Sequence, residues 1–269
     1  MVRVTMLYPS EINYIYSAHG LDLGWNWGAK GRGQTGPFAR NCGLLDTVDY
    51  VHVMQVTPED AAAIEKSTRG QTLCSRWFLL RQYRLTASVF GDICHRTLRR
   101  SNSKLCANIY QPRCLTTPAV IHGRTHEADA LKAFTAKTGL KVNKAGLFIS
   151  IDHPYLGATP DGLVGSEHVV EVKCPYAGRN SRIVPGPAFP FLDMKDDKLV
   201  LKRTHKYFDQ VQGQMALTKR PKAYFVVFTF VDIQIIEVPF DSCFWVGSML
   251  PNLISFYEVH FRKYLAENM

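Results

Sequence analysis

The sequence lacks long apolar runs and paired cysteines. No stretch approaches the roughly 20 apolar residues that a membrane-spanning helix needs, and Met1 is not followed by the basic and apolar regions of a secretory signal. The seven cysteines are an odd number and form no C-x-x-C pair, which disfavours a disulfide framework or a zinc knuckle. These absences predict a soluble intracellular protein of the cytoplasm or nucleus, with reduced thiols and no membrane partner.

Acidic residues are comparatively scarce. The 269 residues include 32 Lys and Arg against 23 Asp and Glu, so the formal net charge is +9. Such a balance suits a polyanionic partner such as nucleic acid, although many basic proteins bind none. With 46% hydrophobic and 20% charged residues, the chain has the composition of a folded globular protein and not of a disordered one.

The first 56 residues show little periodicity. Residues 20–43 are rich in Gly, Trp and Arg, a composition that suits either contact with nucleic acid or an arm packed on the main domain. Thr57 and Pro58 then have the character of an N-cap and a first helical residue. We therefore predict an N-terminal extension over residues 1–56 and a compact domain over residues 57–269.

The remainder alternates between helical and strand patterns. Apolar residues at helical spacing predict helices over residues 75–84, 86–99, 118–137, 204–218 and 241–265. Alternating or continuous apolar patterns predict strands over residues 140–151, 155–159, 168–174, 223–231 and 233–238. Residues 176–203 are interpreted as an insertion loop, because prolines fill the first part and charges the second. This order predicts an α/β domain with a central mixed β-sheet flanked by α-helices.

Two carboxylates are predicted to face each other. If the chain turns about Ser166, Asp161 falls opposite Glu171 in an antiparallel ladder. Directly opposed Cβ atoms lie about 4.5 to 5.5 Å apart, and like charges there destabilise each other unless a cation lies between them. The bare pattern also fits an exposed hairpin with solvated charges. A third acid, Glu127, shares a helical face with apolar residues such as Phe134, and this placement needs an explanation.

Lys173 lies two residues after Glu171, so the two side chains share one face of the predicted strand, while Val172 and Cys174 point to the other face. Oxygen ligands favour Mg²⁺ or Mn²⁺ over zinc. Such an ion lowers the pKa of bound water, and a lysine can orient that water or offset charge in the transition state. The pattern therefore indicates phosphodiester hydrolysis.

Six motifs, in order, resemble those of one known family. They are W-x-x-x-R from Trp77 to Arg81, R-L-T-A-S-V-F-G from Arg84 to Gly91, G-R-T-H-E from Gly123 to Glu127, A-T-P-D-G-L from Ala158 to Leu163, E-V-K-C-P from Glu171 to Pro175, and Q-V-Q-G-Q-M from Gln210 to Met215. Together they resemble the YqaJ-like viral recombinases and the phage lambda exonuclease family of the PD-(D/E)xK nuclease superfamily. The likeness spans residues 77–217 and implies a restriction-endonuclease-like core.

The resemblance also implies roles for individual residues. Two Mg²⁺ or Mn²⁺ ions would be held by Asp161, Glu171 and the carbonyl of Val172, with Glu127 assisting directly or through water. Lys173 would act on the attacking water. Lambda-type relatives bind a terminal 5′-phosphate, and the corresponding positions here are Arg81, Ser88, Thr159 and Gln210. From the residues alone, Ser88 also fits a helix cap, Arg84 a surface charge, and Gln214 a hydrogen bond within the core.

The function implied by the resemblance is a metal-dependent exonuclease. It would degrade double-stranded DNA from an end, 5′ to 3′, and leave a 3′ single-stranded tail for recombination. A single-strand annealing protein and further copies of the chain are the partners it implies. Two alternatives stay open, namely an endonuclease or transposon-associated nuclease with the same site, and a non-catalytic protein that binds DNA ends. The presence of all four site residues, Glu127, Asp161, Glu171 and Lys173, favours an enzyme.

Overall fold

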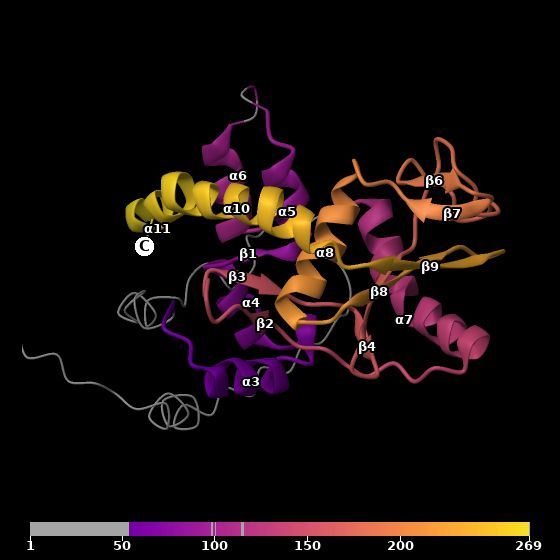
Figure 1. Ribbon diagram of the computed structural model, residues 1–269, viewed down its shortest axis with the longest axis horizontal. Coiled ribbons are helices and arrows are strands. Elements are labelled where there is room, and N and C mark those ends of the chain that lie inside the picture. The colour runs from indigo at the N-terminus through magenta and orange to yellow at the C-terminus, as the bar shows by residue number, and fades with distance from the viewer. Residues whose placement is uncertain (1–53, 98, 100, 114–115, 269) are drawn as a thin grey trace, which may run out of the picture. The chain divides into compact units, whose positions relative to one another are not determined.

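A computed structural model describes residues 54–97, 99, 101–113 and 116–268 of the chain (Figure 1). The chain divides into two units, residues 1–46 and 47–269, and all described residues belong to the second unit. The extension predicted for residues 1–56 therefore lies almost wholly outside the described residues. Among the described residues, no helix has both the length and the apolar character required to cross a membrane.

The centre of the described unit is a four-stranded mixed sheet with the order β4-β5-β8-β9. The strands are β4 Gly162–Val164, β5 His168–Lys173, β8 Lys222–Phe228 and β9 Ile233–Pro239. β4 and β9 run antiparallel to their neighbours, whereas β5 and β8 run parallel to each other. The predicted mixed α/β architecture is confirmed. A smaller sheet, β1-β3-β2, contains β1 Leu85–Thr86, β3 Leu156–Ala158 and β2 Phe148–Ile149.

Two helices cover the central sheet, α7 Pro118–Thr138 and α8 Lys206–Thr218. Side chains alternate along β5, so Val170 and Val172 belong to the cluster that includes Phe134 of α7. Val169 belongs to a second cluster with Val211 of α8. The sheet therefore has an apolar contact with a helix on each face, and the end of β5 lies between the two helices.

The predicted start of one helix and the predicted limits of another are confirmed. Thr57 caps α3 Pro58–Ser67 through a hydrogen bond from the Asp60 N–H, and the Asp60 carboxylate accepts from the Thr57 N–H in return. Helix α7 is capped by Thr117 and ends at Gly139, which has the left-handed φ of 70° that glycine adopts without steric cost. These local signals place Glu127 in the middle of α7.

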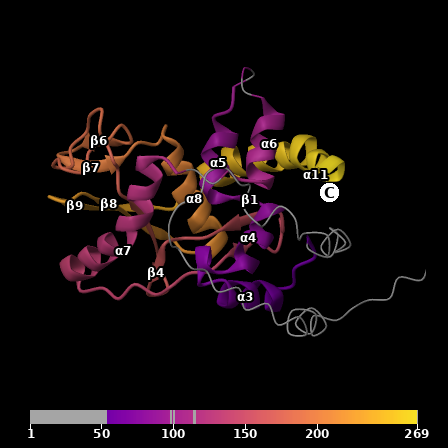
Figure 2. The same ribbon diagram turned by 180° about the vertical axis from the view of Figure 1, so that it is seen from behind.

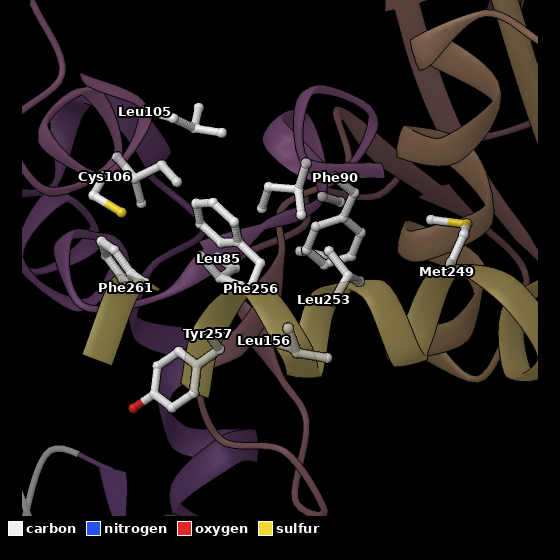
Figure 3. Close-up of a cluster of buried hydrophobic side chains, with 14 of the residues drawn as sticks. Leu85, Phe90, Leu105, Cys106, Leu156, Met249, Leu253, Phe256, Tyr257 and Phe261 are labelled. Atoms are coloured by element: carbon white, nitrogen blue, oxygen red, sulfur yellow. The ribbon is translucent and has the colours of Figure 1, made fainter. Parts of the chain in front are cut away.

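The C-terminal residues form one continuous helical segment that packs on the smaller sheet. It consists of α9 Ser242–Phe244, η4 Trp245–Met249, α10 Leu250–Phe256, η5 Tyr257–Phe261 and α11 Arg262–Asn268. Figure 3 shows its inward side chains, among them Leu253 and Phe256, beside Leu85 and Phe90. The helix predicted over residues 241–265 is confirmed, and it covers β1 and α5, the elements that carry the second motif.

The helix predicted over residues 86–99 is wrong in its second half. Helix α5, Ala87–Cys94, ends early, and the structure adds α6, Asn102–Tyr110, which was not predicted. Helix α4, Ser75–Gln82, ends two residues before the predicted limit, and a 3₁₀ turn η3, Gln71–Leu73, precedes it.

The insertion loop predicted over residues 176–203 is also partly wrong. Its charged part is a β-hairpin of β6 Leu192–Lys195 and β7 Lys198–Leu201. Both views place this hairpin at the β8–β9 side of the unit, away from α6 and α11 (Figures 1 and 2). Ile183, Phe189 and Phe191 of the preceding stretch are buried in the same cluster as α8, so the segment is anchored by its apolar residues.

Candidate active site

The hairpin register places Asp161 opposite Glu171, as predicted from the sequence. Gly162 pairs with Val170 and Leu163 with Val169, and the Asp161 N–H donates to the Val170 carbonyl at 3.0 Å. The Val172 N–H in turn donates to Asp161 Oδ2 at 2.7 Å. The side chain of Asp161 is thus fixed to β5 by a backbone donor, although Asp161 itself precedes β4.

Glu171 is the most thoroughly bonded acid of the site. Its side chain is 3% exposed, and Oε1 accepts from Lys173 Nζ at 2.5 Å and from Gln210 Nε2 at 2.6 Å. The second oxygen accepts from Gln214 Nε2 at 2.6 Å. A buried carboxylate is costly unless it is paired and hydrogen-bonded, and here one ammonium and two amides meet that requirement.

Helix α8 is held close enough to supply these amides because glycines permit its approach to α5. A Cβ at Gly213 would lie 2.3 Å from Phe90 Cδ2, and one at Gly91 would lie 2.6 Å from Lys206 Cα. Neither position accommodates a larger residue without a shift of the backbone or of a buried ring. The contact between α5 and α8 therefore determines where Gln210 and Gln214 lie relative to β5.

Glu127, Asp161, Glu171 and Lys173 line one pocket of about 320 Å³ at the end of β5. The remaining lining residues come from the N-terminal half of α7, from the end of β5 and from two aromatic positions: Ala119, Val120, Gly123, Arg124, Val172, Cys174, Pro175, Phe191 and Tyr207. The structure therefore brings together the four residues predicted to be catalytic. Glu127 comes from α7, whereas Asp161, just before β4, and Glu171 and Lys173 of β5 come from one hairpin more than 30 residues further along the chain.

The acids of this pocket repel one another. Burial raises the pKa of Asp161 well above its usual range, and the charges of Glu171 and Glu127 raise it further. Burial and the charge of Glu171 raise the pKa of Glu127 as well. Burial opposes the charge on Lys173, but Glu171 and Asp161 outweigh that effect, so the pKa of the ammonium is raised. The pocket has an excess of negative charge that Lys173 does not fully compensate.

The donor chemistry of the pocket fits a divalent cation. Carboxylate oxygens are the ligands that Mg²⁺ and Mn²⁺ prefer, and a cation would relieve the repulsion between the acids. In the part of the chain that the structure describes, however, no three acidic, histidine or cysteine side chains are gathered closely enough to enclose an ion. Both oxygens of Glu171 accept hydrogen bonds from the protein, Oε1 from Lys173 and Gln210 and Oε2 from Gln214.

The structure brings only two of the four residues predicted to bind a 5′-phosphate into direct contact with each other. Thr159 Oγ1 accepts from Trp77 Nε1 at 3.1 Å and from Arg81 Nη1 at 3.4 Å, so Arg81 and Thr159 lie together. Ser88 is exposed in the first turn of α5, 3.2 Å from the hydroxyl of Thr86, and β1 pairs with β3 just before Thr159. Gln210 instead contacts Glu171 and Lys173.

Arg81 has no acidic partner among the described residues. Its guanidinium stacks over the Trp77 ring, 4.2 Å from the centroid, and burial lowers its pKa to about 10. The group therefore stays charged at neutral pH. Arg84, for which a surface position was an open alternative, is instead fully buried and donates to the carbonyls of Pro154 and Leu80.

Some contributors to the site were missed or left open. Gln214 lies one turn after Gln210, and its amide contacts Glu171 rather than only the core. Gln71, with a left-handed φ of 46°, donates to the carbonyl of Pro160 just before Asp161. The spacing of the two glutamines was a usable signal, whereas nothing in the sequence connects Gln71 with Pro160. Cys174 packs as a small apolar residue, as predicted, and burial raises its pKa to about 12.

The mixed sheet, its two covering helices and the acids at the strand end define a restriction-endonuclease-like fold. The profile of the YqaJ-like viral recombinase domain matches residues 76–221, and the chain belongs to this family. The chain is also similar to the alkaline nuclease of Autographa californica nuclear polyhedrosis virus. The two are 27% identical over 216 residues, a match that covers 71% of this chain and 50% of that protein. The chain thus spans half the length of that relative.

Solved structures share the fold. An alkaline exonuclease from Laribacter hongkongensis superposes with a TM-score of 0.56 at 22% identity, covering 72% of this chain and 96% of that one. The Shutoff and Exonuclease Protein from Kaposi's sarcoma-associated herpesvirus gives a TM-score of 0.52 at 12% identity, covering 81% of this chain and 75% of that one. At these identities the likeness concerns the arrangement of helices and strands.

Proposed function

We propose that the protein is a metal-dependent DNA nuclease. The observation that carries this proposal is the convergence of Glu127, Asp161, Glu171 and Lys173 on one pocket, in a chain that belongs to the YqaJ-like family. The names of the relatives, alkaline nuclease and alkaline exonuclease, support the same class of activity. A bound Mg²⁺ or Mn²⁺, with two ions per site proposed, would activate water and polarise the phosphodiester.

The chain's own residues would prepare this reaction. Asp161, Glu171 and the Val172 carbonyl would hold the metal, and Glu127 would complete the site directly or through water. Lys173 lies beside Glu171 at the pocket wall, where its ammonium can orient a water or offset charge on the reacting phosphate. The glutamines of α8 hold Glu171 in place and so act as positioning residues.

We further propose that the enzyme is an exonuclease that degrades double-stranded DNA from an end, 5′ to 3′, and leaves a 3′ single-stranded tail. Arg81 and Thr159 support this mode, because an unpaired guanidinium beside a hydroxyl suits a terminal 5′-phosphate. Ser88, near the N-terminus of α5, is a third candidate donor. An annealing protein and a homo-oligomer are the partners that would accompany this role.

The test is digestion of a linear duplex with 5′-phosphates, labelled separately at each end, alongside a closed circular duplex, in Mg²⁺ or in EDTA. Mg²⁺-dependent release from the 5′ end alone, with an intact circle, is the expected result. Lys173→Ala should reduce the rate by about 10²- to 10³-fold, the usual loss when one electrostatic contributor is removed. Lys195→Ala, at an exposed lysine of the β6–β7 hairpin, is the matched control.

The outcomes separate the alternatives. Cleavage of the closed circle would replace the exonuclease by an endonuclease, and binding of DNA ends without any cleavage would leave a non-catalytic protein. A duplex with 5′-hydroxyl ends tests the phosphate site. Wild type should prefer the phosphorylated end, Arg81→Ala should lose that preference, and the control Arg113→Ala, at an exposed arginine, should keep it.

A further inference from the structure

Four exposed apolar or aromatic side chains gather beside the catalytic pocket. Phe230 is 53% exposed and Tyr176 is 38% exposed, and Val184 and Val231 are each 59% exposed. Three contacts join the segments that carry them. The Phe230 N–H donates to the Arg179 carbonyl at 2.8 Å, Thr229 Oγ1 donates to the Ser181 carbonyl at 3.0 Å, and the Ile183 N–H donates to Asp232 Oδ2 at 3.0 Å.

Two histidines of α7 complete an aromatic cluster with these residues. The His122 ring lies 5.6 Å from Tyr176 and 5.4 Å from Phe230, measured between centroids, and the His126 ring lies 4.9 Å from Phe230. His122 and His126 are themselves 4.5 Å apart. We call Tyr176, Phe230, His122 and His126 the aromatic cluster. The rings of the cluster meet edge to face or at a tilt. The exposed rings of Tyr176 and Phe230 are therefore packed against histidine rings.

The aromatic cluster adjoins the catalytic pocket on two sides. Tyr176 directly follows Cys174 and Pro175, which line the pocket. On α7, Gly123 and Glu127 line the pocket, and each is the next residue after a histidine of the cluster. A helix turns by about 100° per residue, so the histidines occupy the stripe next to the one that faces the pocket.

Side chains of both charges lie near the cluster: Asp129 contacts His126 at 3.1 Å, and three arginines lie close by. Arg179 lies over the Tyr176 ring at 3.9 Å, and Arg124 lines the catalytic pocket. Arg182 is exposed two residues before Val184. The structure records no ion pair for these three arginines among the residues that it describes. A surface that interleaves exposed rings with unpaired arginines suits a nucleic acid strand, whose bases stack on rings and whose phosphates attract guanidinium groups.

We propose that Tyr176 and Phe230, backed by His122 and His126, form a stacking platform for an unpaired nucleobase of the strand whose phosphodiester lies in the catalytic pocket. The proposal rests on the proposed nuclease function and gives it a substrate feature, namely a single-stranded or frayed segment next to the scissile bond. A duplex end must open for one strand to be cut and the other spared. Stacking would stabilise the opened base by replacing its lost neighbour.

The test uses a short oligonucleotide with a fluorescent base, 2-aminopurine, in an unpaired overhang, because stacking on a ring quenches its emission. Binding and quenching are measured with Ca²⁺ in place of Mg²⁺, and a blunt duplex of the same sequence serves as the second ligand. Phe230→Ala should weaken binding of the overhang roughly 5- to 100-fold and reduce the quenching, as the loss of one base–aromatic stack does. Binding of the blunt duplex should change much less.

Two further variants separate stacking from apolar contact in general. Phe230→Tyr retains the ring and should behave as wild type, whereas Phe230→Leu retains apolar area and should behave as Phe230→Ala. Val246→Ala, at a position on the C-terminal helix that is 62% exposed, should have no effect. If Phe230→Leu matches wild type, or if quenching persists in Phe230→Ala, no base stacks there and the platform is wrong.

The same measurements distinguish a failure of the stacking platform from a failure of the proposed nuclease function. If wild type cleaves DNA while Phe230→Ala and Tyr176→Ala retain full binding and quenching, the nuclease stands and the platform fails. If wild type binds and quenches the overhang without ever cleaving DNA, the platform stands and the nuclease fails.

Discussion

The two sides of the proposed catalytic pocket differ in how their carboxylates are compensated. On the α8 side, Glu171 accepts from an ammonium and two side-chain amides. On the α7 side, Glu127 has no hydrogen-bond donor among the described residues, and Asp161 has the single backbone donor of Val172. One acid is therefore held by the protein itself, whereas the other two carry charge that a cation or a substrate must offset. The protein's own donors therefore compensate the acid on the α8 side more fully than the two acids on the α7 side.

Neutralising one acid on each side should produce the largest difference in stability. Glu171→Gln leaves the buried Lys173 ammonium without its anionic partner, which should cost about 3–5 kcal/mol of unfolding free energy. The melting temperature should then fall on the order of 10 °C. Glu127→Gln removes a repelled charge and should leave the melting temperature of the metal-free protein unchanged or higher. Thermal unfolding in EDTA measures both, and equal losses in the two variants would refute the asymmetry.

The two variants, Glu171→Gln and Glu127→Gln, should not differ in the same way in cleavage activity. Both variants remove a carboxylate of the proposed metal site, so both should lose nearly all activity in Mg²⁺. A Glu127→Gln protein that folds well and cuts normally would remove Glu127 from the proposed site while leaving the stability argument intact.

A smaller effect is expected when the amides around Glu171 are removed. Gln214→Ala deletes a buried donor to Oε2 and should cost about 1–3 kcal/mol, the desolvation penalty of a carboxylate oxygen that has lost its partner. Gln234→Ala, which removes a longer contact of 3.2 Å to Asp232, is the matched control and should cost little. Denaturant unfolding distinguishes the two. A Gln214→Ala protein as stable as the control would show that Glu171 does not depend on α8.

The sequence predicted the positions of the acids better than it predicted the residues that hold those acids in place. The reason is the separation along the sequence over which the interactions act. The placement of Asp161 opposite Glu171 follows from one short turn. The position of Glu127 follows from a helix whose two ends are clearly marked. The amides that hold Glu171, and the contact of Gln71 with Pro160, join residues far apart in the sequence. No local pattern specifies such contacts, because they depend on how α8 and η3 pack.

The errors of prediction have similar causes. Helix α5 ends at Cys94, and the next residue, His95, contacts buried Asp209 at 2.7 Å, a long-range contact without a local signal. The β6–β7 hairpin did have a local signal. Asp196 and Asp197 have φ of 49° and 58°, the left-handed conformations of a two-residue hairpin turn, and aspartate is among the residues that tolerate them. The high charge of that stretch obscured the alternation around the turn.

The repulsion among the acids should also make the stability of the protein depend on pH. Burial and neighbouring acids raise the pKa of Asp161 in the folded state above its unfolded value. The folded protein therefore binds this proton more readily, and stability is lost as pH rises from the unfolded pKa through the folded one. Asp161→Asn removes this penalty and still accepts the Val172 N–H. In EDTA at neutral pH we expect a melting temperature about 2–4 °C higher, equivalent to ~1 kcal/mol, with no gain at low pH. A gain independent of pH would mean that charge is not the cause.

The smallest expected change in stability concerns Gly123, on the α7 side of the pocket. A Cβ added there would meet nothing within 4 Å, so Gly123→Ala should not clash, and it should stabilise the helix by about 0.5–1 kcal/mol. The same methyl group would project into the pocket, where a DNA backbone would need that space. We therefore expect a protein that is slightly more stable and cuts more slowly. The slower cleavage should come from a higher KM, and the affinity for the metal should be unchanged. Gly247→Ala, also on a helix with open space, is the control and should leave cleavage unchanged. If Gly123→Ala cuts as fast as wild type, the substrate does not approach α7 at this point. The α7 side would then contact only the metal.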